Sequence, residues 1–456
     1  MSLALKREIG LPSAVLLVIG GIVGTGIFLN PAVVARSLHS PVLILSVWAV
    51  GGVMAILGAF VYAELADRMP ATGGEFAYER SAFGDLVAFL FGWTTLLVVQ
   101  TGGMAAVALS FSKYALVLFG HEAPAGGPDP LANIVAVTVL ALLAITNCLG
   151  VKSGNGVQTL LGVLKLLAIA GLVFGGLFMI AKPFPITHPV LDRAPSTDLV
   201  KSFGAALIPV VFAYGGWQTA NYVGGEIKNP RRNLVLALLI GVIAVIGLYL
   251  AVNIACLRAL GPKALGETLA PASDVLKVAI GPVGAKLAAL AIAVSTLGYL
   301  SQGMLTGPRV YLAMASDGLF FSQLAKVTEK TRVPAVAIVV QAVWTAVLVL
   351  SGTYEQIVAY DVSINFLFFA VTGAAVFVFR RRDRTASAQT RADAGFRIPL
   401  HPFSTVLFIL ICIIVVANGF WSDLRDSLIG YSILAAGVPA YFLWRHFPKL
   451  IKKTES

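Results

Sequence analysis

Residues 20–28 read GGIVGTGIF and interrupt an apolar stretch near the start of the chain. The whole stretch has the length of a membrane helix, which needs about 20 apolar residues to cross about 30 Å of hydrocarbon. A glycine inside an ordinary helix costs about 1 kcal/mol relative to alanine. The consecutive residues Gly24, Thr25 and Gly26 therefore predict a break in the middle of the first membrane span.

The composition of the whole chain is that of a membrane protein. Of its 456 residues, 58% are hydrophobic and 12% are charged, whereas about 25% of the residues in soluble domains are charged. This composition excludes a water-soluble fold and predicts an all-α polytopic protein surrounded by the lipid bilayer. The first residues, MSLALKREIGLP, lack the apolar core and the cleavage site of a signal peptide.

Hydropathy along the chain predicts twelve membrane spans separated by short polar connections. Two of these connections, 67–84 and 261–282, contain short amphipathic segments that we expect to form helices outside the membrane or at its surface. The expected spans cover about residues 12–38, 42–66, 85–119, 131–149, 151–181, 199–227, 233–260, 283–316, 334–352, 354–379, 401–420 and 427–446.

The distribution of Lys and Arg predicts the orientation of these spans. With both termini in the cytoplasm, the inner segments carry more than twice as many Lys and Arg residues as the outer ones, in agreement with the positive-inside rule. This asymmetry accounts for the net charge of +11 without a nucleic-acid partner. At the inner end of the sixth span, Glu226 lies close in sequence to Arg231 and Arg232, and we interpret it as part of a gate or of a surface ion pair.

A second interruption falls in the sixth expected span. Residues 212–230 read FAYGGWQTANYVGGEIKNP, which puts Gly215 and Gly216 in the middle of the membrane. Interrupted helices five spans apart are typical of transporters built from an inverted repeat of five helices, in which substrate binds at the breaks. The alternative is close helix packing, for which Gly20 and Gly24 have the small-xxx-small spacing.

The two breaks have the chemistry of a site for a zwitterion. Backbone groups freed in hydrocarbon cost several kcal/mol each unless a ligand or a polar cavity satisfies them. The half-helix that starts near Gly26 directs free N–H groups toward the break, which suits a carboxylate, and the hydroxyl of Thr25 adds a donor. The carbonyl ends of the opposite half-helices suit an ammonium group. An amino acid matches both.

A single lysine, Lys165, lies in the middle of the fifth expected span, NGVQTLLGVLKLLAIAGLVF. A lysine at the centre of a membrane helix costs about 2.5–3.5 kcal/mol on insertion scales, so we expect it to face the protein interior. There it either loses its charge or pairs with carbonyl oxygens. One interpretation is that Lys165 is a fixed tether to the broken first span. The other is that it is a resident or proton-responsive positive charge in the place where a coupling ion would sit. Both interpretations argue against a sodium ion at that position.

Three polar residues in later spans have two interpretations each. The hydroxyl of Tyr249 in the seventh span needs a partner, which is either the substrate or the protein itself. Ser295 and Thr296 in the eighth span either line the cavity or bond back to their own helix.

Other classes of function lack their motifs. The sequence has no HExxH, no paired membrane aspartates and no G-x-S-x-G, so we do not expect an enzyme. It has no repeated filter loop of the kind that channels use. The five histidines have no metal-ligand spacing, and Cys148, Cys256 and Cys412 are far apart in apolar runs, so we expect no metal, no cofactor and no disulfide.

Several stretches together resemble the amino acid–polyamine–organocation (APC) superfamily, and within it the L-type amino acid transporter (LAT) group and its bacterial relatives. They occur in the same order as the spans, from residue 8 to beyond residue 400. These stretches are VGTGIF (23–28), YAELADRMPATGGEFAY (62–78), FAYGGWQTANYVGGEIKNPRRNL (212–234), GPRVYLAMASDGLF (307–320) and FRIPLHP (396–402).

The resemblance implies a LeuT-type fold of twelve helices, a five-plus-five inverted repeat with broken first and sixth helices and two further C-terminal helices. The first repeat would cover residues 1–181 and the second 182–379, and 380–456 would hold a cytoplasmic loop, the last two helices and the C-terminal tail. It also implies that amino acids cross by alternating access.

Site residues follow from the same resemblance. The GTG of the first break would hold the α-carboxylate, and carbonyls near Ile22, Phe212 and Tyr214 would hold the amino group, with Phe212 as an aromatic lid. Tyr249 resembles a tyrosine in the seventh span that several members use at the substrate site. Lys165 resembles the lysine in the fifth span of sodium-independent members. The predicted substrate-binding residues are Ile22, Gly24, Thr25, Gly26, Phe212, Ala213, Tyr214, Gly215 and Tyr249, and the predicted substitutes for an ion site are Lys165 and Ser295.

The chain also departs from the animal LAT pattern. It has no proline near Gln100–Thr101, and it has SQG at 301–303 where many members have an NG pair, so both positions bear on substrate range. Segment 120–130 has no cysteine, so we expect no disulfide-linked heavy chain. We expect a bacterial inner-membrane protein that transports neutral L-amino acids, small ones such as alanine or serine preferentially. Exchange and proton symport remain open.

Overall fold

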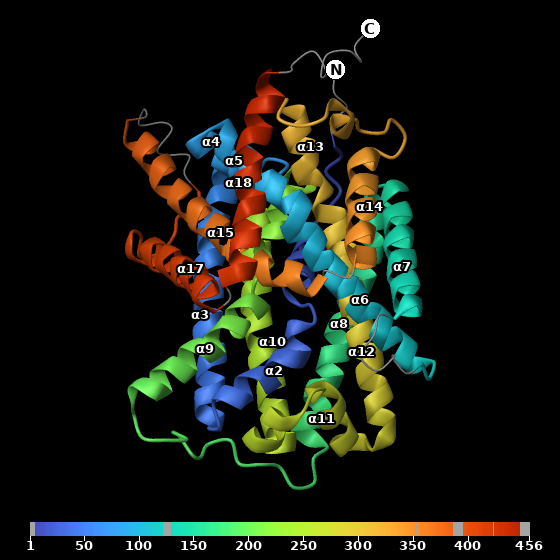
Figure 1. The fold of residues 1–456 in the computed structure, drawn as a ribbon, viewed down its shortest axis with the longest axis vertical. Helices are drawn as coiled ribbons and strands as arrows, with labels where there is room; N and C mark the ends of the chain where they lie inside the picture. Colours follow the sequence, from blue (N-terminus) through green and yellow to red (C-terminus); the bar gives the residue numbers. More distant parts are fainter. Residues whose placement is uncertain (1–4, 122–128, 352–353, 386–394, 423, 447–456) are drawn as a thin grey trace.

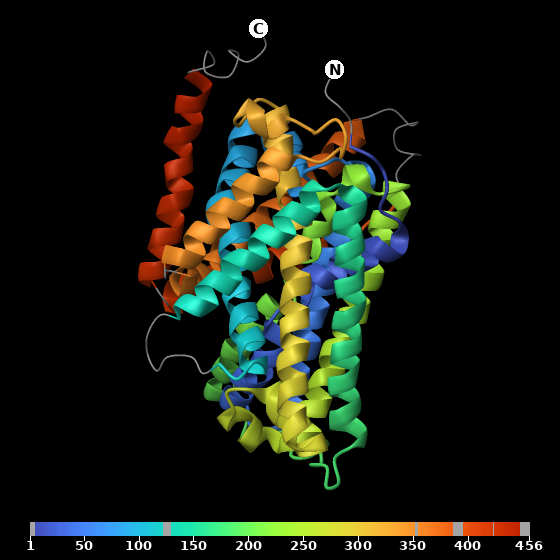
Figure 2. The ribbon, with the colours of Figure 1, turned by 90° about the vertical axis from the view of Figure 1, so that its right-hand side faces the viewer.

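The computed structural model describes residues 5–121, 129–351, 354–385, 395–422 and 424–446. These segments form a bundle of helices, most of which run along its long axis (Figures 1 and 2). Outside the helices, the described residues pair as strands only at two isolated bridges, Ile9 with Ile227 and Thr72 with Val223. The prediction of an all-helical protein is therefore confirmed.

The described residues of the first half of the chain form nine helices and one short π-helical turn, η1. Prolines start two of the long ones, where the missing N–H costs no hydrogen bond. These elements are α1 (Leu11–Ile22), α2 (Gly26–Ser37), α3 (Pro41–Arg68), α4 (Glu75–Phe83), α5 (Asp85–Thr94), η1 (Thr95–Val99), α6 (Gln100–Leu118), α7 (Pro130–Cys148), α8 (Val151–Phe178) and α9 (Thr197–Ala213).

The second half begins with two 3₁₀ segments and continues with long helices. These elements are η2 (Trp217–Tyr222), η3 (Gly224–Glu226), α10 (Pro230–Glu267), α11 (Pro271–Ile280), α12 (Pro282–Thr306), α13 (Pro308–Ser316), η4 (Ser322–Ala325), α14 (Ala335–Ser351), α15 (Tyr354–Thr385), α17 (Phe403–Ser422) and α18 (Leu424–His446).

Ten of the described helices are long and apolar enough to cross a membrane, and the pair α1 and α2 makes eleven. The protein is therefore an integral membrane protein. The expected span 334–352 corresponds to α14, an apolar helix of 17 residues, which is shorter than the others. The exact number of twelve spans stays a prediction.

Both amphipathic connections form helices, as the sequence predicts. Helix α4 lies in the connection 67–84 and α11 in the connection 261–282. The seventh span is longer than expected, because the helical chain continues beyond residue 260 through a kink at Gly261, where φ is 70°. Glycine adopts this positive φ without strain.

The two ends of the bundle differ in what they contain. The first described residues, α4, α13 and the last turns of α18 lie at one end, which we call the terminal end (Figure 1). The connection between α8 and α9 and the helix α11 lie at the opposite end (Figure 1). The described chain thus begins and ends on the same side. Which side faces the cytoplasm stays a prediction.

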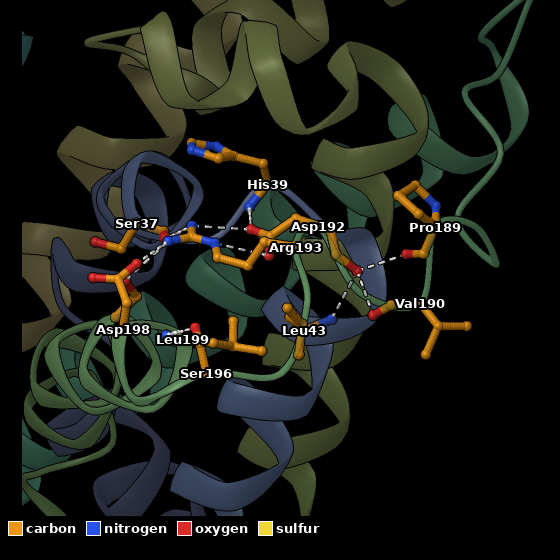
Figure 3. Close-up of polar contacts among 12 residues, drawn as sticks. Ser37, His39, Leu43, Pro189, Val190, Asp192, Arg193, Ser196, Asp198 and Leu199 are labelled. Carbon is orange, nitrogen blue, oxygen red and sulfur yellow. Dashed lines mark hydrogen bonds and ion pairs between the residues drawn. The ribbon is translucent and has the colours of Figure 1, made fainter.

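At the opposite end, the connection between α8 and α9 is fastened to the start of α3 (Figure 3). The carboxylate of Asp192 accepts the backbone N–H of His39 at 2.8 Å. Arg193 pairs with Asp198 at 2.9 Å and donates to the carbonyl of Ser37 at 3.2 Å. Burial raises the pKa of Asp192, but the hydrogen bonds from His39 and Arg193 outweigh it and hold that pKa below its usual range.

Candidate functional site

Two interrupted spans meet in the middle of the bundle. Helix α1 ends at Ile22 and α2 begins at Gly26, and the two axes differ by 41°. Helix α9 ends at Ala213, and the chain resumes as the 3₁₀ segment η2 at Trp217. Both interruptions that the sequence predicts are therefore present.

The two breaks cross in direct backbone contact, and two glycines make this possible. A Cβ added to Gly21 would lie 2.6 Å from the carbonyl oxygen of Gly216. Gly216 itself has φ of 110°, a conformation that favours glycine. Gly20 packs as tightly, because a Cβ added to it would lie 2.5 Å from Gln158 Nε2. A Cβ added to Gly24, by contrast, would meet its nearest atom at 3.7 Å, which is ordinary contact. Close packing thus explains Gly20 and Gly21 but not Gly24.

A cavity of about 160 Å³ lies at the breaks, between them and helices α6, α12 and α15. Seven of the nine predicted substrate-binding residues line it: Ile22, Gly24, Thr25, Gly26, Phe212, Ala213 and Gly215.

The helix ends give the cavity two polarities. The N–H groups of the first two residues of α2 have no partner within their own helix, whereas the N–H of Phe28 donates to the carbonyl oxygen of Thr25 at 3.0 Å. The side chain of Thr25, the residue before α2, does not cap them. The last residues of α1 and α9, Ile22 and Ala213, line the same space, so the C-terminal ends of both helices lie against the cavity. One wall therefore attracts an anion and another attracts a cation.

Tyr249 and Tyr214 lie behind the cavity wall. The hydroxyl of Tyr249 is 3.2 Å from the carbonyl oxygen of Ile22 and 3.1 Å from that of Ala213. It therefore holds the last carbonyls of α1 and α9 together. The ring of Tyr214 packs against that of Tyr249 with 4.9 Å between centroids, and Trp48 meets Tyr249 edge-on at 5.5 Å.

Lys165 reaches the first break from α8. Its side chain is fully buried, and its ammonium group donates to the carbonyl oxygen of Gly20 at 3.2 Å and to that of Val23. This is the carbonyl pairing that the sequence suggests. In the neighbouring helix α12, Ser295 is buried with its hydroxyl unpartnered among the described residues. The hydroxyl of Thr296 bonds back to its own helix at Ile292 and Ala293.

Polar residues of the neighbouring helices also line the cavity. Gln100 and Gln302, the positions of the two sequence departures, both line it, and Gln302 donates to the hydroxyl of Thr219 at 2.6 Å. Tyr299 and Asn365 also line it and were not predicted. A polar amide in the apolar stretch around Asn365 is the signal that could have identified it.

A buried ion pair joins two elements at the terminal end. Arg309 of α13 contacts both carboxylate oxygens of Glu226, at 2.6 and 3.0 Å, and both side chains are fully buried. The interpretation of Glu226 as part of a surface pair with Arg231 or Arg232 is therefore wrong, because its partner is distant in sequence. Within the described residues, no group of three or more His, Cys, Asp or Glu side chains could hold a metal ion.

Comparisons with known proteins agree with this geometry. The family model described as amino acid permease matches residues 9–440. The human large neutral amino acids transporter small subunit 2 is 32% identical over 98% of this chain and 82% of its own length. The serine/threonine exchanger SteT of Bacillus subtilis (strain 168) is 30% identical over 96% of this chain and 97% of its own length.

A third relative extends the range of similar proteins. The rat b(0,+)-type amino acid transporter 1 is 29% identical over 97% of this chain and 89% of its own length. The match of the family model covers nearly the whole helical bundle, including both breaks and the cavity between them. The chain therefore belongs to the amino acid permease family of the APC superfamily.

Proposed function

We propose that this permease exchanges small neutral L-amino acids across the membrane, without sodium, by alternating access. The observation that carries the proposal is the cavity at the two breaks. It meets the N-terminus of α2 on one side and the carbonyl ends of α1 and α9 on another. These walls suit the α-carboxylate and the α-amino group of one zwitterion.

The lining of the cavity favours a small, uncharged side chain. Among the described lining residues there is no Asp, Glu, Lys or Arg to pair with a charged side chain. Gln100, Gln302 and Asn365 supply amides that can bond a hydroxyl group. The volume of about 160 Å³ suits alanine, serine or threonine better than an aromatic amino acid.

The position of Lys165 supports transport without sodium. Its ammonium group bonds the carbonyl oxygens of Gly20 and Val23, which are the kind of ligand that a sodium ion would use at a helix break. A cation built into the protein makes a dissociable one unnecessary there. The names of two relatives, a serine/threonine exchanger and a large neutral amino acids transporter, agree with neutral substrates.

The remaining structural assignments belong to the same proposal. Breaks in the first and sixth expected spans support the five-plus-five repeat, with units at 1–181, 182–379 and 380–456. Cytoplasmic termini and a bacterial inner membrane follow from the charge asymmetry and from the resemblance. The proposed lack of a disulfide-linked heavy chain depends on 120–130, most of which lies outside the described residues.

A second candidate is an amino acid symporter driven by protons. It is favoured by the same lysine, because a fully buried ammonium group that contacts only carbonyl oxygens among the described residues has no counter-ion to hold its proton. Loss of that proton would release the first break from α8 and couple the movement of the break to protonation.

Uptake of labelled L-serine and L-alanine into sodium-free proteoliposomes separates the two candidates. We expect uptake to require unlabelled amino acid inside the vesicles and to ignore a proton gradient. Gradient-driven uptake into vesicles without internal amino acid would make the protein a proton symporter. A strict requirement for sodium would overturn both candidates.

A further inference from the structure

Two buried glutamates lie on α4, outside the cavity described above. Glu75 and Glu79 are four residues apart, so their side chains share one face of the helix. They are 1% and 0% exposed. Two ionised carboxylates cannot stay close together in a buried site, because each charge raises the free energy of the other. At least one of the two must therefore hold a proton.

The hydroxyl groups around Glu75 and Glu79 identify which of the two glutamates holds the proton. Tyr62 donates to Glu75 Oε1 at 2.5 Å and Tyr222 lies 3.4 Å from Glu75 Oε2. Thr372 Oγ1 lies 3.1 Å from Glu75 and 3.0 Å from Glu79. A hydroxyl has a single hydrogen, so Thr372 donates to one carboxyl group and must accept from the other.

Glu75 is the better site for a negative charge because two tyrosines already donate to it. Thr372 then donates to Glu75 and accepts a hydrogen bond from a protonated Glu79. The second oxygen of Glu79 is buried and has no hydrogen-bond partner among the described residues, which a neutral carboxyl group tolerates far better than a charged one. Burial and the neighbouring Glu75 both raise the pKa of Glu79 well above its usual range.

Other titratable groups near the pair do not supply a positive charge. In the part of the chain that the structure describes, the titratable groups that interact with the pair are tyrosines of α3, α4 and η2 and a thiol of α17. On α4 itself, Arg80 pairs with Asp85 and Asp317 away from the pair. Burial raises the pKa of Glu75 to about 7. These groups are Tyr62, Tyr78, Tyr222 and Cys412.

The pair is mechanically connected to the second break. Tyr222, the last residue of η2, contacts Glu75 and also lines the cavity. Its carbonyl oxygen accepts the N–H of Gly73 at 2.9 Å, and Tyr78 donates to Asn221 at 3.2 Å. The chain before α4 and α4 itself therefore hold η2 at the terminal end of the molecule.

We propose that Glu79 is a proton-binding site that holds the terminal end closed, and that release of its proton frees η2 and opens that end. The effect on transport rests on the proposed alternating access, but the protonation of Glu79 does not. Protonation requires the dry, closed packing, so the proton favours the closed state. The stabilisation of the closed state by this proton is fully present at low pH on the terminal side. It is lost as that pH rises through the raised pKa of Glu79.

The first test is infrared spectroscopy of the purified, membrane-reconstituted protein at a pH about one unit above the pKa of Glu75, so that Glu75 is mostly ionised. We expect the carbonyl band of a protonated carboxylic acid in the wild type, and its loss in Glu79→Gln. Glu267→Gln is the matched control, because Glu267 is an exposed residue at the end of α10 and its replacement should leave the band in place. Absence of the band from the wild type, or its survival in Glu79→Gln, would overturn the proposal.

The second test varies the pH on the terminal side of proteoliposomes while the other side stays constant. We expect the rate of serine exchange in the wild type to rise by about threefold to tenfold as the pH on the terminal side rises through the raised pKa of Glu79, since one unit of pKa difference between states allows up to tenfold. Glu79→Gln should exchange serine with no such dependence. If Glu79→Gln keeps the pH profile of the wild type, Glu79 does not control opening of the terminal end, although the proposed exchange stands. If none of the proteins exchanges serine, the proposed function is wrong, and the infrared result on Glu79 still stands.

Discussion

At the scale of single residues, Gly26 is the position where a side chain should most directly disturb the proposed carboxylate site. A Cβ there would lie 3.2 Å from the Cβ of Ala213, which is tighter than ordinary contact, and the two methyl groups of valine would add further bulk at a position that lines the cavity. We expect Gly26→Val to weaken serine binding more than tenfold, which corresponds to more than about 1.4 kcal/mol. A radioligand binding assay on purified protein measures this.

A matched control separates this loss from a general effect of valine in a membrane helix. Gly204 lies in α9, and a Cβ added there meets nothing within 4 Å. Gly204→Val should keep both serine affinity and the elution profile in gel filtration. Full affinity in Gly26→Val would contradict the assignment of the first break to the carboxylate.

At the scale of elements, Lys165 connects α8 to the end of α1 by the contacts described above. Its removal leaves two carbonyl oxygens without their donor, and a hydrogen bond to a charged group contributes about 1.5–3 kcal/mol. We expect Lys165→Ala to lower exchange at least tenfold, and ethylammonium ions to restore part of it by occupying the vacated space. Serine exchange in proteoliposomes with and without ethylammonium measures both effects.

Lys152, on the same helix, is the control for that experiment. Its side chain is 85% exposed, so Lys152→Ala should leave exchange unchanged and insensitive to ethylammonium. Wild-type rates in Lys165→Ala would mean that the lysine neither tethers the break nor replaces an ion.

The same elements indicate how much could be predicted from the sequence. The first break and Lys165 were found because glycines and a charge violate the pattern of an apolar span, and the physical cost of that violation is local. Glu75 was not found, because the stretch EFAYER lies in a polar connection and is typical of an exposed helix. Its burial depends on Tyr222 and Thr372, which are 147 and 297 residues away in sequence.

At the scale of the whole molecule, the sequence predicts the helices but not their pairing. Periodicity and hydropathy identify which segments are apolar, and they contain no information about which side chains meet. The partner of Glu226 was assigned to neighbouring arginines for this reason, whereas Arg309 lies 83 residues away. The contact of Tyr249 with the ends of α1 and α9 also depends on three-dimensional packing.

The pair of Glu226 and Arg309 leads to a prediction about the conformation of the entire bundle. The backbone carbonyl of Glu226 also accepts the N–H groups of Glu8 and Ile9, at 2.9 and 3.0 Å. The chain before α1, the segment η3 and helix α13 therefore meet at this residue. Removing one partner of a buried ion pair costs about 3–5 kcal/mol because the other charge stays buried and unpaired. We expect Glu226→Gln to shift the molecule toward opening at the terminal end.

The measurement is the labelling rate of a cysteine introduced at Ala220, a fully buried residue of η2, in a background without native cysteines. A membrane-impermeant maleimide on the terminal side should label it at least tenfold faster in Glu226→Gln. The double variant Glu226→Met with Arg309→Met should return the rate toward that of the parent, because an apolar pair of similar volume can replace a buried ion pair. Arg80→Gln, which breaks a half-exposed ion pair at the same end, should change little. Equal labelling in all four proteins would mean that the buried pair does not hold this end closed.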